Sequence, residues 1–133
     1  MKIEEQVLSR EQMKYLQELG VDTSDASMAW YMSPKKNQWK IKVKDKFAHE
    51  MLLRISPERY IPTYIIGDLI EKLPIRIGSV NRKIYFTGKY IIVSYSSPDG
   101  SLIEYRGTTL LCLLYSLLCW VAINQKELLE VKK

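Results

Sequence analysis

Apolar positions recur at helical spacing near the start of the chain. Over residues 13–19 they fall three apart, which places them on one face of a helix. Ser9 and Gln12 form a capping-box pattern before this run, and Gly20 stands where a glycine commonly ends a helix. The pattern predicts a short amphipathic helix over residues 10–19, whose apolar stripe must dock on another element.

Two runs typical of strands follow, over residues 28–32 and 38–47. In the second run, apolar residues alternate with lysines. This alternation assigns Trp39, Ile41 and Val43 to one face and the lysines to the other. A polar, proline-containing connection joins the two runs. The segment therefore predicts an antiparallel hairpin with its apolar face on the core.

The middle of the chain contains a second helical pattern. Apolar residues at helical spacing predict a helix over residues 65–73, which Pro74 stops. The preceding segment, residues 48–60, fits either a helical turn or a loop.

Residues typical of strands dominate the chain from residue 75 onward. β-Branched and aromatic side chains are concentrated at 84–86, 90–96 and 101–106, which predicts three strands. The sequence Ser-Pro-Asp-Gly at 97–100 is typical of a type I turn and joins the last two of them.

A final helix follows, capped by Thr108 or Thr109 and running to about Asn124. It lies in an uncharged stretch of nineteen residues, 107–125, which raises the alternative of a membrane tail anchor. The strictly apolar part, residues 110–123, spans only about 21 Å as a helix, which is short of a bilayer core of ~30 Å. We therefore expect a core helix covered by other elements and no stable membrane insertion.

The predicted elements follow the order α-β-β-α-β-β-β-α. This order indicates an α+β fold with one antiparallel sheet of four to five strands and helices packed mainly on one face. A chain of 133 residues fits a single domain over residues 1–133. Hydrophobic residues at 47% and charged residues at 26% exclude wholesale disorder, collagen-like repeats and a polytopic membrane protein.

The net charge of +5 is concentrated in the middle of the chain. Residues 1–33 sum to −3, residues 34–98 sum to +8, and residues 99–133 balance. A basic segment is typical of proteins that contact phosphates or an anionic surface. It is also common in proteins that only remain soluble, so charge alone leaves both interpretations open.

The most distinctive surface pattern is the row of lysines at every second position of residues 38–46. Together with a stretch at 72–98 that contains no acidic residue, it forms a candidate nucleic-acid contact that binds phosphates without selecting bases. The candidate residues are Lys40, Lys42, Lys44, Lys46, Arg76, Arg82, Lys83 and Lys89. The alternative is structural, because lysines commonly prevent an edge strand from pairing with another chain.

Aromatic residues near these charges could stack on bases if their rings are exposed. They are Trp30, Tyr31, Trp39, Tyr85 and Tyr90. Tyrosine is also common at protein interfaces and in ordinary antiparallel sheets. The aromatic content therefore agrees with nucleic-acid binding without selecting it.

Candidate catalytic groups are few. The single histidine, His49, lies beside Glu50 in the ambiguous segment, and Asp22 and Asp25 are three residues apart. We expect a solvated histidine and two carboxylates that cap turns. No glycine-rich phosphate loop or nucleophilic triad can be assembled, so an enzyme, a cofactor and a small-molecule substrate are not expected.

The two cysteines, Cys112 and Cys119, lie about 10 Å apart in a helix, too far for a disulfide. We expect both thiols to be buried and free in a reducing cytoplasm, with no metal site. The chain start has no apolar segment of a secretion signal, which also favours a cytoplasmic location.

Three stretches carry a resemblance: residues 8–20 (LSREQMKYLQELG) with 25–28 (DASM), residues 61–64 (IPTY) with 68–74 (DLIEKLP), and residues 109–111 (TLL) through 118–120 (LCW). Together they resemble small uncharacterised phage-related proteins from prophages and integrative elements of Bacteroides-type gut bacteria. Members commonly have an acidic residue early in the last helix, where this chain has Leu111 and Cys112. The resemblance implies a bacterial or phage cytoplasmic accessory protein and no tail anchor. It implies no activity, cofactor or catalytic residue.

The sequence therefore predicts a non-enzymatic accessory protein that acts as an interaction module. Its expected partner is a protein, including a second copy of itself in a homodimer. The alternative is sequence-independent binding of nucleic acid through the lysine-rich strand face.

Overall fold

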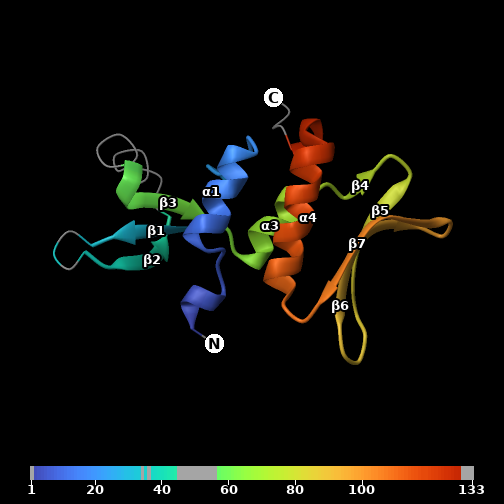
Figure 1. Cartoon of the computed structure of the whole chain (residues 1–133), viewed down its shortest axis with the longest axis horizontal. Helices are drawn as coiled ribbons and strands as arrows, with labels where there is room; N and C mark the ends of the chain where they lie inside the picture. The colour runs from blue at the N-terminus through green and yellow to red at the C-terminus, as the bar shows by residue number, and fades with distance from the viewer. Residues whose placement is uncertain (1, 34, 36, 45–56, 130–133) are drawn as a thin grey trace. The chain divides into compact units, whose positions relative to one another are not determined.

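The computed structural model describes residues 2–33, 35, 37–44 and 57–129. The chain divides into two compact units, Met1–Asp68 and Leu69–Lys133, and each contains its own antiparallel sheet (Figure 1). The α+β class with antiparallel pairing is confirmed. The seven strands of the described residues form two sheets of three and four, whereas the sequence predicted one sheet. The expectation of one domain over residues 1–133 stays a prediction.

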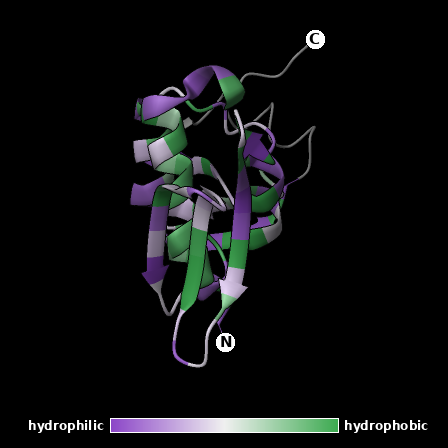
Figure 2. Cartoon of the chain, turned by 90° about the vertical axis from the view of Figure 1, so that its right-hand side faces the viewer, coloured by the Kyte–Doolittle hydropathy of each residue, from purple (hydrophilic) through white to green (hydrophobic). Residues whose placement is uncertain are grey.

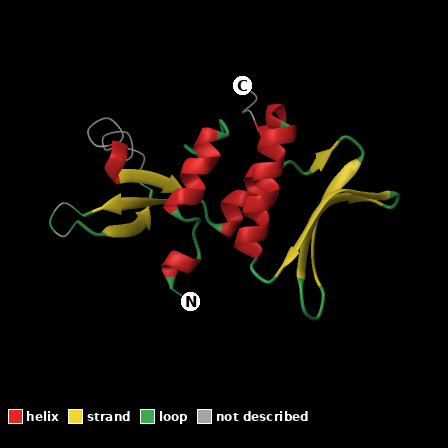
Figure 3. Ribbon diagram, viewed as in Figure 1, coloured by secondary structure: helices red, strands yellow, loops and turns green. Residues whose placement is uncertain are grey.

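The first unit contains one sheet and the helix that precedes it (Figure 3). In chain order its elements are η1 (Ile3–Glu5), α1 (Arg10–Glu18), β1 (Met28–Met32), β2 (Trp39–Val43), η2 (Pro57–Arg59) and β3 (Tyr60–Thr63), after which α3 (Ile66–Lys72) begins. The strands pair in the order β2-β1-β3, and both pairs are antiparallel. The predicted hairpin is confirmed as β1 and β2.

Local signals determine both ends of α1. The hydroxyl of Ser9 accepts a hydrogen bond from the Gln12 backbone N–H at 3.1 Å, and the Gln12 side chain accepts one from the Ser9 N–H at 2.8 Å. At the other end, Gly20 has a φ of 89°, which lets the Val21 N–H donate back to the Leu16 carbonyl. The predicted capping box and glycine stop are confirmed.

The sequence pattern did not predict β3 as a strand. It is four residues long and contains Pro62, which has no N–H to donate to a neighbouring strand. This residue is tolerated because β3 is at the edge of its sheet, where one side needs no partner strand. The 48–60 segment thus ends in η2 and the first residue of β3, and residues 48–56 lie outside the described residues.

The predicted apolar face of β2 is not buried, which corrects the sequence interpretation. Val43 is 72% exposed, and Trp39 and Ile41 are only half-buried. The reason is the position of β2 at one edge of the sheet, while α1 packs against β3 at the other edge. Alternation in a strand determines which side chains share a face, but a second element must cover that face.

The second unit is built around a four-stranded antiparallel sheet. Its elements after α3 are β4 (Arg76–Ile77), β5 (Val80–Phe86), β6 (Ile91–Ser97), β7 (Gly100–Gly107), α4 (Leu110–Asn124) and η3 (Lys126–Leu129). The strands lie in the order β4-β5-β6-β7. The three predicted strands, the turn at 97–100 and the helices over 65–73 and up to Asn124 are confirmed within a few residues.

Helix α4 packs against β6 and β7. Leu114 and Leu117 of the helix and Val93 and Tyr95 of β6 are completely buried. This packing forms the core of the unit, as expected for a helix with so few polar residues. Among the described residues, no helix is long and apolar enough to cross a membrane.

Two details of α4 differ from expectation. Thr109 occupies the N-cap position, but its side chain makes no capping hydrogen bond. Cys112 is exposed and Cys119 is half-buried, so neither thiol is fully buried as predicted. The sheet covers only part of the circumference of the helix. Burial does raise the pKa of the Cys119 thiol, with a hydrogen bond to Tyr115 acting in the opposite direction.

Replacing Ser9 by alanine tests the capping box. Ser9→Ala removes the acceptor for the Gln12 N–H, so we expect the free energy of unfolding to fall by about 1 kcal/mol in urea denaturation. Ser101→Ala, at an exposed position of β7, is the matched control and should change stability little. Equal effects of the two substitutions would contradict the role of the cap.

Tyr95 makes the free energy of unfolding depend on pH in the alkaline range. Its hydroxyl donates to the Pro74 carbonyl at 2.7 Å, and burial raises its pKa well above the ordinary value of about 10, with Arg82 opposing. Because the raised pKa belongs to the folded state, the stabilisation is present below pH ~10 and declines above it, where the unfolded chain ionises. We expect Tyr95→Phe to lose less stability than wild type between about pH 8 and 10.5. Equal losses in urea unfolding would contradict this.

Candidate nucleic-acid interface

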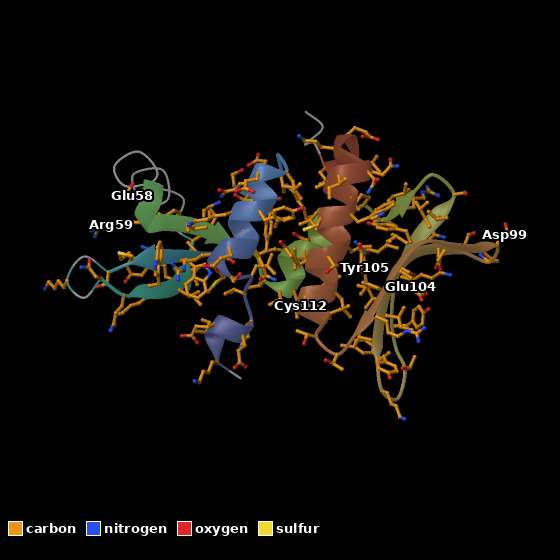
Figure 4. The ribbon with its side chains drawn as sticks, in the orientation of Figure 1. Glu58, Arg59, Asp99, Glu104, Tyr105 and Cys112 are labelled. Atoms are coloured by element: carbon orange, nitrogen blue, oxygen red, sulfur yellow. The ribbon has the colours of Figure 1, made fainter. Side chains whose placement is uncertain are left out.

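The four-stranded sheet has one face covered by α4 and one face that we call the open face. Side chains alternate along each strand, so Tyr105 lies on the α4 side of β7 and Glu104 lies on the other side (Figure 4). The open face contains Arg76 on β4, Asn81, Lys83 and Tyr85 on β5, Ile92, Ser94 and Ser96 on β6, and Glu104 and Arg106 on β7. The sheet faces the viewer in Figure 2.

The open face has two serines on β6 and longer side chains on the neighbouring strands β5 and β7. Ser94 is opposite Lys83 on β5 and Glu104 on β7. Ser94 and Ser96 are buried, and their hydroxyls lie 3.2 Å apart. Lys83 and Glu104 are exposed. The polar groups that a ligand meets first are therefore on β5 and β7.

Basic side chains outnumber acidic ones on the open face. Three cations on this face are exposed: Arg76, Lys83 and Arg106. The same face contains one carboxylate, that of Glu104. Arg106 approaches Glu104 at 3.7 Å, with side chains 57% and 36% exposed. An ion pair this accessible to water is weak, so it leaves Arg106 able to contact a phosphate.

Two tyrosines lie at the end of the open face nearest the β5–β6 turn. Tyr85 is 42% exposed and Tyr90 is 45% exposed. Tyr90 is two residues before Ile92, so the alternation of side chains places it on the same face as Ile92. The guanidinium carbon of Arg106 lies 5.9 Å from the centre of the Tyr90 ring. Aromatic rings and cations are thus combined on one exposed surface.

The basic residues predicted in this half of the chain have different roles. Arg76 and Lys83 lie on the open face, and Lys89 is exposed in the turn between β5 and β6. Arg82 is on the opposite side of β5, where one guanidinium nitrogen donates to the carbonyls of Ile70 at 2.6 Å and Leu73 at 3.1 Å. Arg82 therefore holds the end of α3.

The lysine row belongs to the first unit. Lys40, Lys42 and Lys44 share one face of the edge strand β2 and its end, whereas Lys46 lies outside the described residues. The Lys42 ammonium lies 4.7 Å from the centre of the Tyr31 ring, and the Lys44 ammonium donates to the Ser24 carbonyl. This edge position agrees with the structural interpretation of the lysines, in which they prevent an edge strand from pairing with another chain.

The tryptophans of the first unit have structural contacts. The Trp30 indole N–H donates to the Leu8 carbonyl at 2.9 Å. The Arg10 guanidinium lies 4.4 Å from the centre of the Trp39 ring and 6.0 Å from that of Trp30. Of the five aromatics singled out from the sequence, Tyr85 and Tyr90 are the two on the open face.

Arg106 is a residue of the open face that the charge pattern of the sequence does not indicate. It lies in a segment whose charges balance, so a count of charge along the chain does not single it out. The available signal was the alternation of β7, where Glu104 and Arg106 fall on the same side.

The candidate acidic groups make turn and core contacts. An Asp22 side-chain oxygen accepts from the Ser24 N–H at 3.0 Å, and an Asp25 oxygen accepts from the Tyr64 hydroxyl at 2.6 Å. Burial, and then Asp25, raise the pKa of Tyr64. His49 lies outside the described residues. Within the described part of the chain, no group of three or more His, Cys, Asp or Glu side chains is placed to hold a metal ion.

Comparison with known proteins adds no family. No protein-family model, curated protein or solved structure matches the chain.

The assignment of Arg82 to a structural role can be tested against its neighbour. Arg82→Met removes two hydrogen bonds to the end of α3, and we expect a loss of roughly 2 kcal/mol in the free energy of unfolding. Lys83→Met, on the same strand but on the open face, should change stability by less than about 0.5 kcal/mol. Similar losses in urea denaturation would contradict the division of roles.

Proposed function

We propose that this chain is a non-enzymatic binding protein that contacts nucleic acid through the open face, independently of base sequence. The observation that carries the proposal is the placement of Tyr85 and Tyr90 beside Lys83 and Arg106 on an exposed sheet surface. The resemblance to phage-related proteins supports a cytoplasmic accessory role in a mobile element.

The chemistry of the face favours a polyanion over a protein surface. Three exposed cations share it with one carboxylate, and Lys89 adds a fourth cation at the neighbouring turn. Lysine and arginine bind phosphate oxygens in any sequence context, because the phosphates are the same at every nucleotide. The contact is therefore expected to be strong at low salt and to show little preference among sequences.

Titration at two salt concentrations tests this function. With three or four phosphate contacts, affinity for a labelled single strand of about 12 nucleotides should fall roughly 20- to 50-fold between about 50 and 200 mM salt. Fluorescence anisotropy measures both values. At the lower salt, Lys83→Glu should weaken binding about tenfold, because it removes one contact and adds repulsion.

Two further charge reversals locate the site. Lys126→Glu makes the same charge change in η3, beyond the helix on the other side of the sheet, and should leave affinity nearly unchanged. Lys40→Glu tests the lysine row. A loss with Lys40→Glu but not with Lys83→Glu would transfer the site to β2 and overturn the proposal. Absence of binding at low salt would also overturn it and favour a protein partner or self-association.

A further inference from the structure

We infer that the nucleic acid held by the open face is a single strand, with bases stacked on Tyr85 and Tyr90. This inference depends on the proposed function, because it names the class of nucleic acid that the same face takes. It goes further by assigning the binding energy to two tyrosine rings in addition to the cations.

The strand register places the two tyrosines next to each other. Tyr85 is opposite Ile92, and Tyr90 is two residues before Ile92 on the same side, so the tyrosines are diagonal neighbours across β5 and β6. The turn between them holds Tyr90 in place. The Thr87 N–H donates to the Tyr90 carbonyl at 2.8 Å, and the Tyr90 N–H donates to the Thr87 hydroxyl at 3.0 Å.

Both rings are accessible to a ligand. Each tyrosine keeps more than two-fifths of its surface exposed, although neither lies at a chain end. Exposed aromatic rings are the groups on which unpaired bases stack, and the gain does not depend on which base is present. In a duplex the base faces are already stacked on each other, so these two rings would gain little from it.

The cations are placed to hold a strand whose bases lie on the tyrosines. Lys83 is two residues from Tyr85 on the same face, roughly 7 Å along the strand. On the other flank, Arg106 lies beside Tyr90. Each ring therefore has a cation next to it, Lys83 beside Tyr85 and Arg106 beside Tyr90, and these cations can hold the phosphates of a strand whose bases lie on the rings.

The low number of cations also favours a single strand. Electrostatic binding of a duplex depends on neutralising many phosphates, and this face supplies only Arg76, Lys83 and Arg106, with Lys89 close by. Stacking supplies the additional binding energy, and only unpaired bases offer it.

The test compares oligothymidylate of about 12 nucleotides with a duplex of the same length in fluorescence anisotropy at low salt. Wild-type protein should bind the single strand at least tenfold more tightly. Tyr85→Leu and Tyr90→Leu should each weaken single-strand binding about tenfold and leave duplex binding unchanged, whereas Tyr85→Phe and Tyr90→Phe should retain it. Tyr15→Leu is the matched control, because Tyr15 on α1 is also 42% exposed.

A measurement on the wild-type protein removes the dependence on folded variants. Oligothymidylate containing 5-iodouracil is cross-linked by ultraviolet light to the rings on which it stacks, and the trypsin-digested protein is then sequenced by mass spectrometry. Cleavage after Lys83, Lys89 and Arg106 separates residues 84–89, which contain Tyr85, from residues 90–106, which begin with Tyr90. Cross-links at Tyr85 or Tyr90 support the inference, and cross-links confined to the first unit overturn it.

The outcomes separate the inference from the proposed function. Equal affinity for duplex and single strand, with no effect of the leucine variants but a loss in Lys83→Glu, would overturn the inference and keep the proposed function. Absence of binding to either probe would overturn both. Losses with Tyr15→Leu as large as those with Tyr85→Leu would show that the open face has no special role, and they too would overturn the inference.

Discussion

The packing of α4 against β6 and β7 decides which side of the four-stranded sheet can meet a ligand. Val93 and Tyr95 lose all exposure on the side of the helix, and the core of this unit forms there. Burial of apolar surface is the main favourable contribution to folding, so the helix must take the more apolar side of the sheet. On the other side, Lys83, Tyr85 and Arg106 are left exposed to solvent, and the proposed function uses that side.

Because helices cover only one side of the sheet, two neighbouring residues of β5 have different roles. Arg82 and Lys83 are both basic and adjacent, but the two-residue period of a strand sends them to opposite faces. Arg82 meets the carbonyls at the end of α3, where a guanidinium satisfies acceptors that the helix leaves unpaired. Lys83 remains exposed next to Ser94. Basic charge in this segment therefore serves stability on one side and, in the proposed function, ligand contact on the other.

The first unit is held together by a different set of contacts. The Leu8 carbonyl accepts hydrogen bonds from the Trp30 indole and from the Thr63 hydroxyl, which ties the residues before α1 to two strands. The Arg10 guanidinium lies over the rings of Trp30 and Trp39. On the other face of β2, Lys42 and Lys44 contact Tyr31 and the Ser24 carbonyl. Arg10, Lys42 and Lys44 therefore make contacts within the fold of this unit, and the proposed interface is in the second unit, where exposed cations lie beside exposed tyrosines.

Interactions between residues close together in the chain specify several elements of this fold. The capping box of α1, its glycine stop, the turn at 97–100 and the α+β class all depend on residues within a few positions of one another. Tertiary structure decided the division into two sheets, the pairing of β3, the exposure of Val43 and Cys112, and the approach of Arg106 to Tyr90. Each of these depends on which distant element covers a given face. Periodicity shows which residues share a face, but only packing decides whether that face is buried.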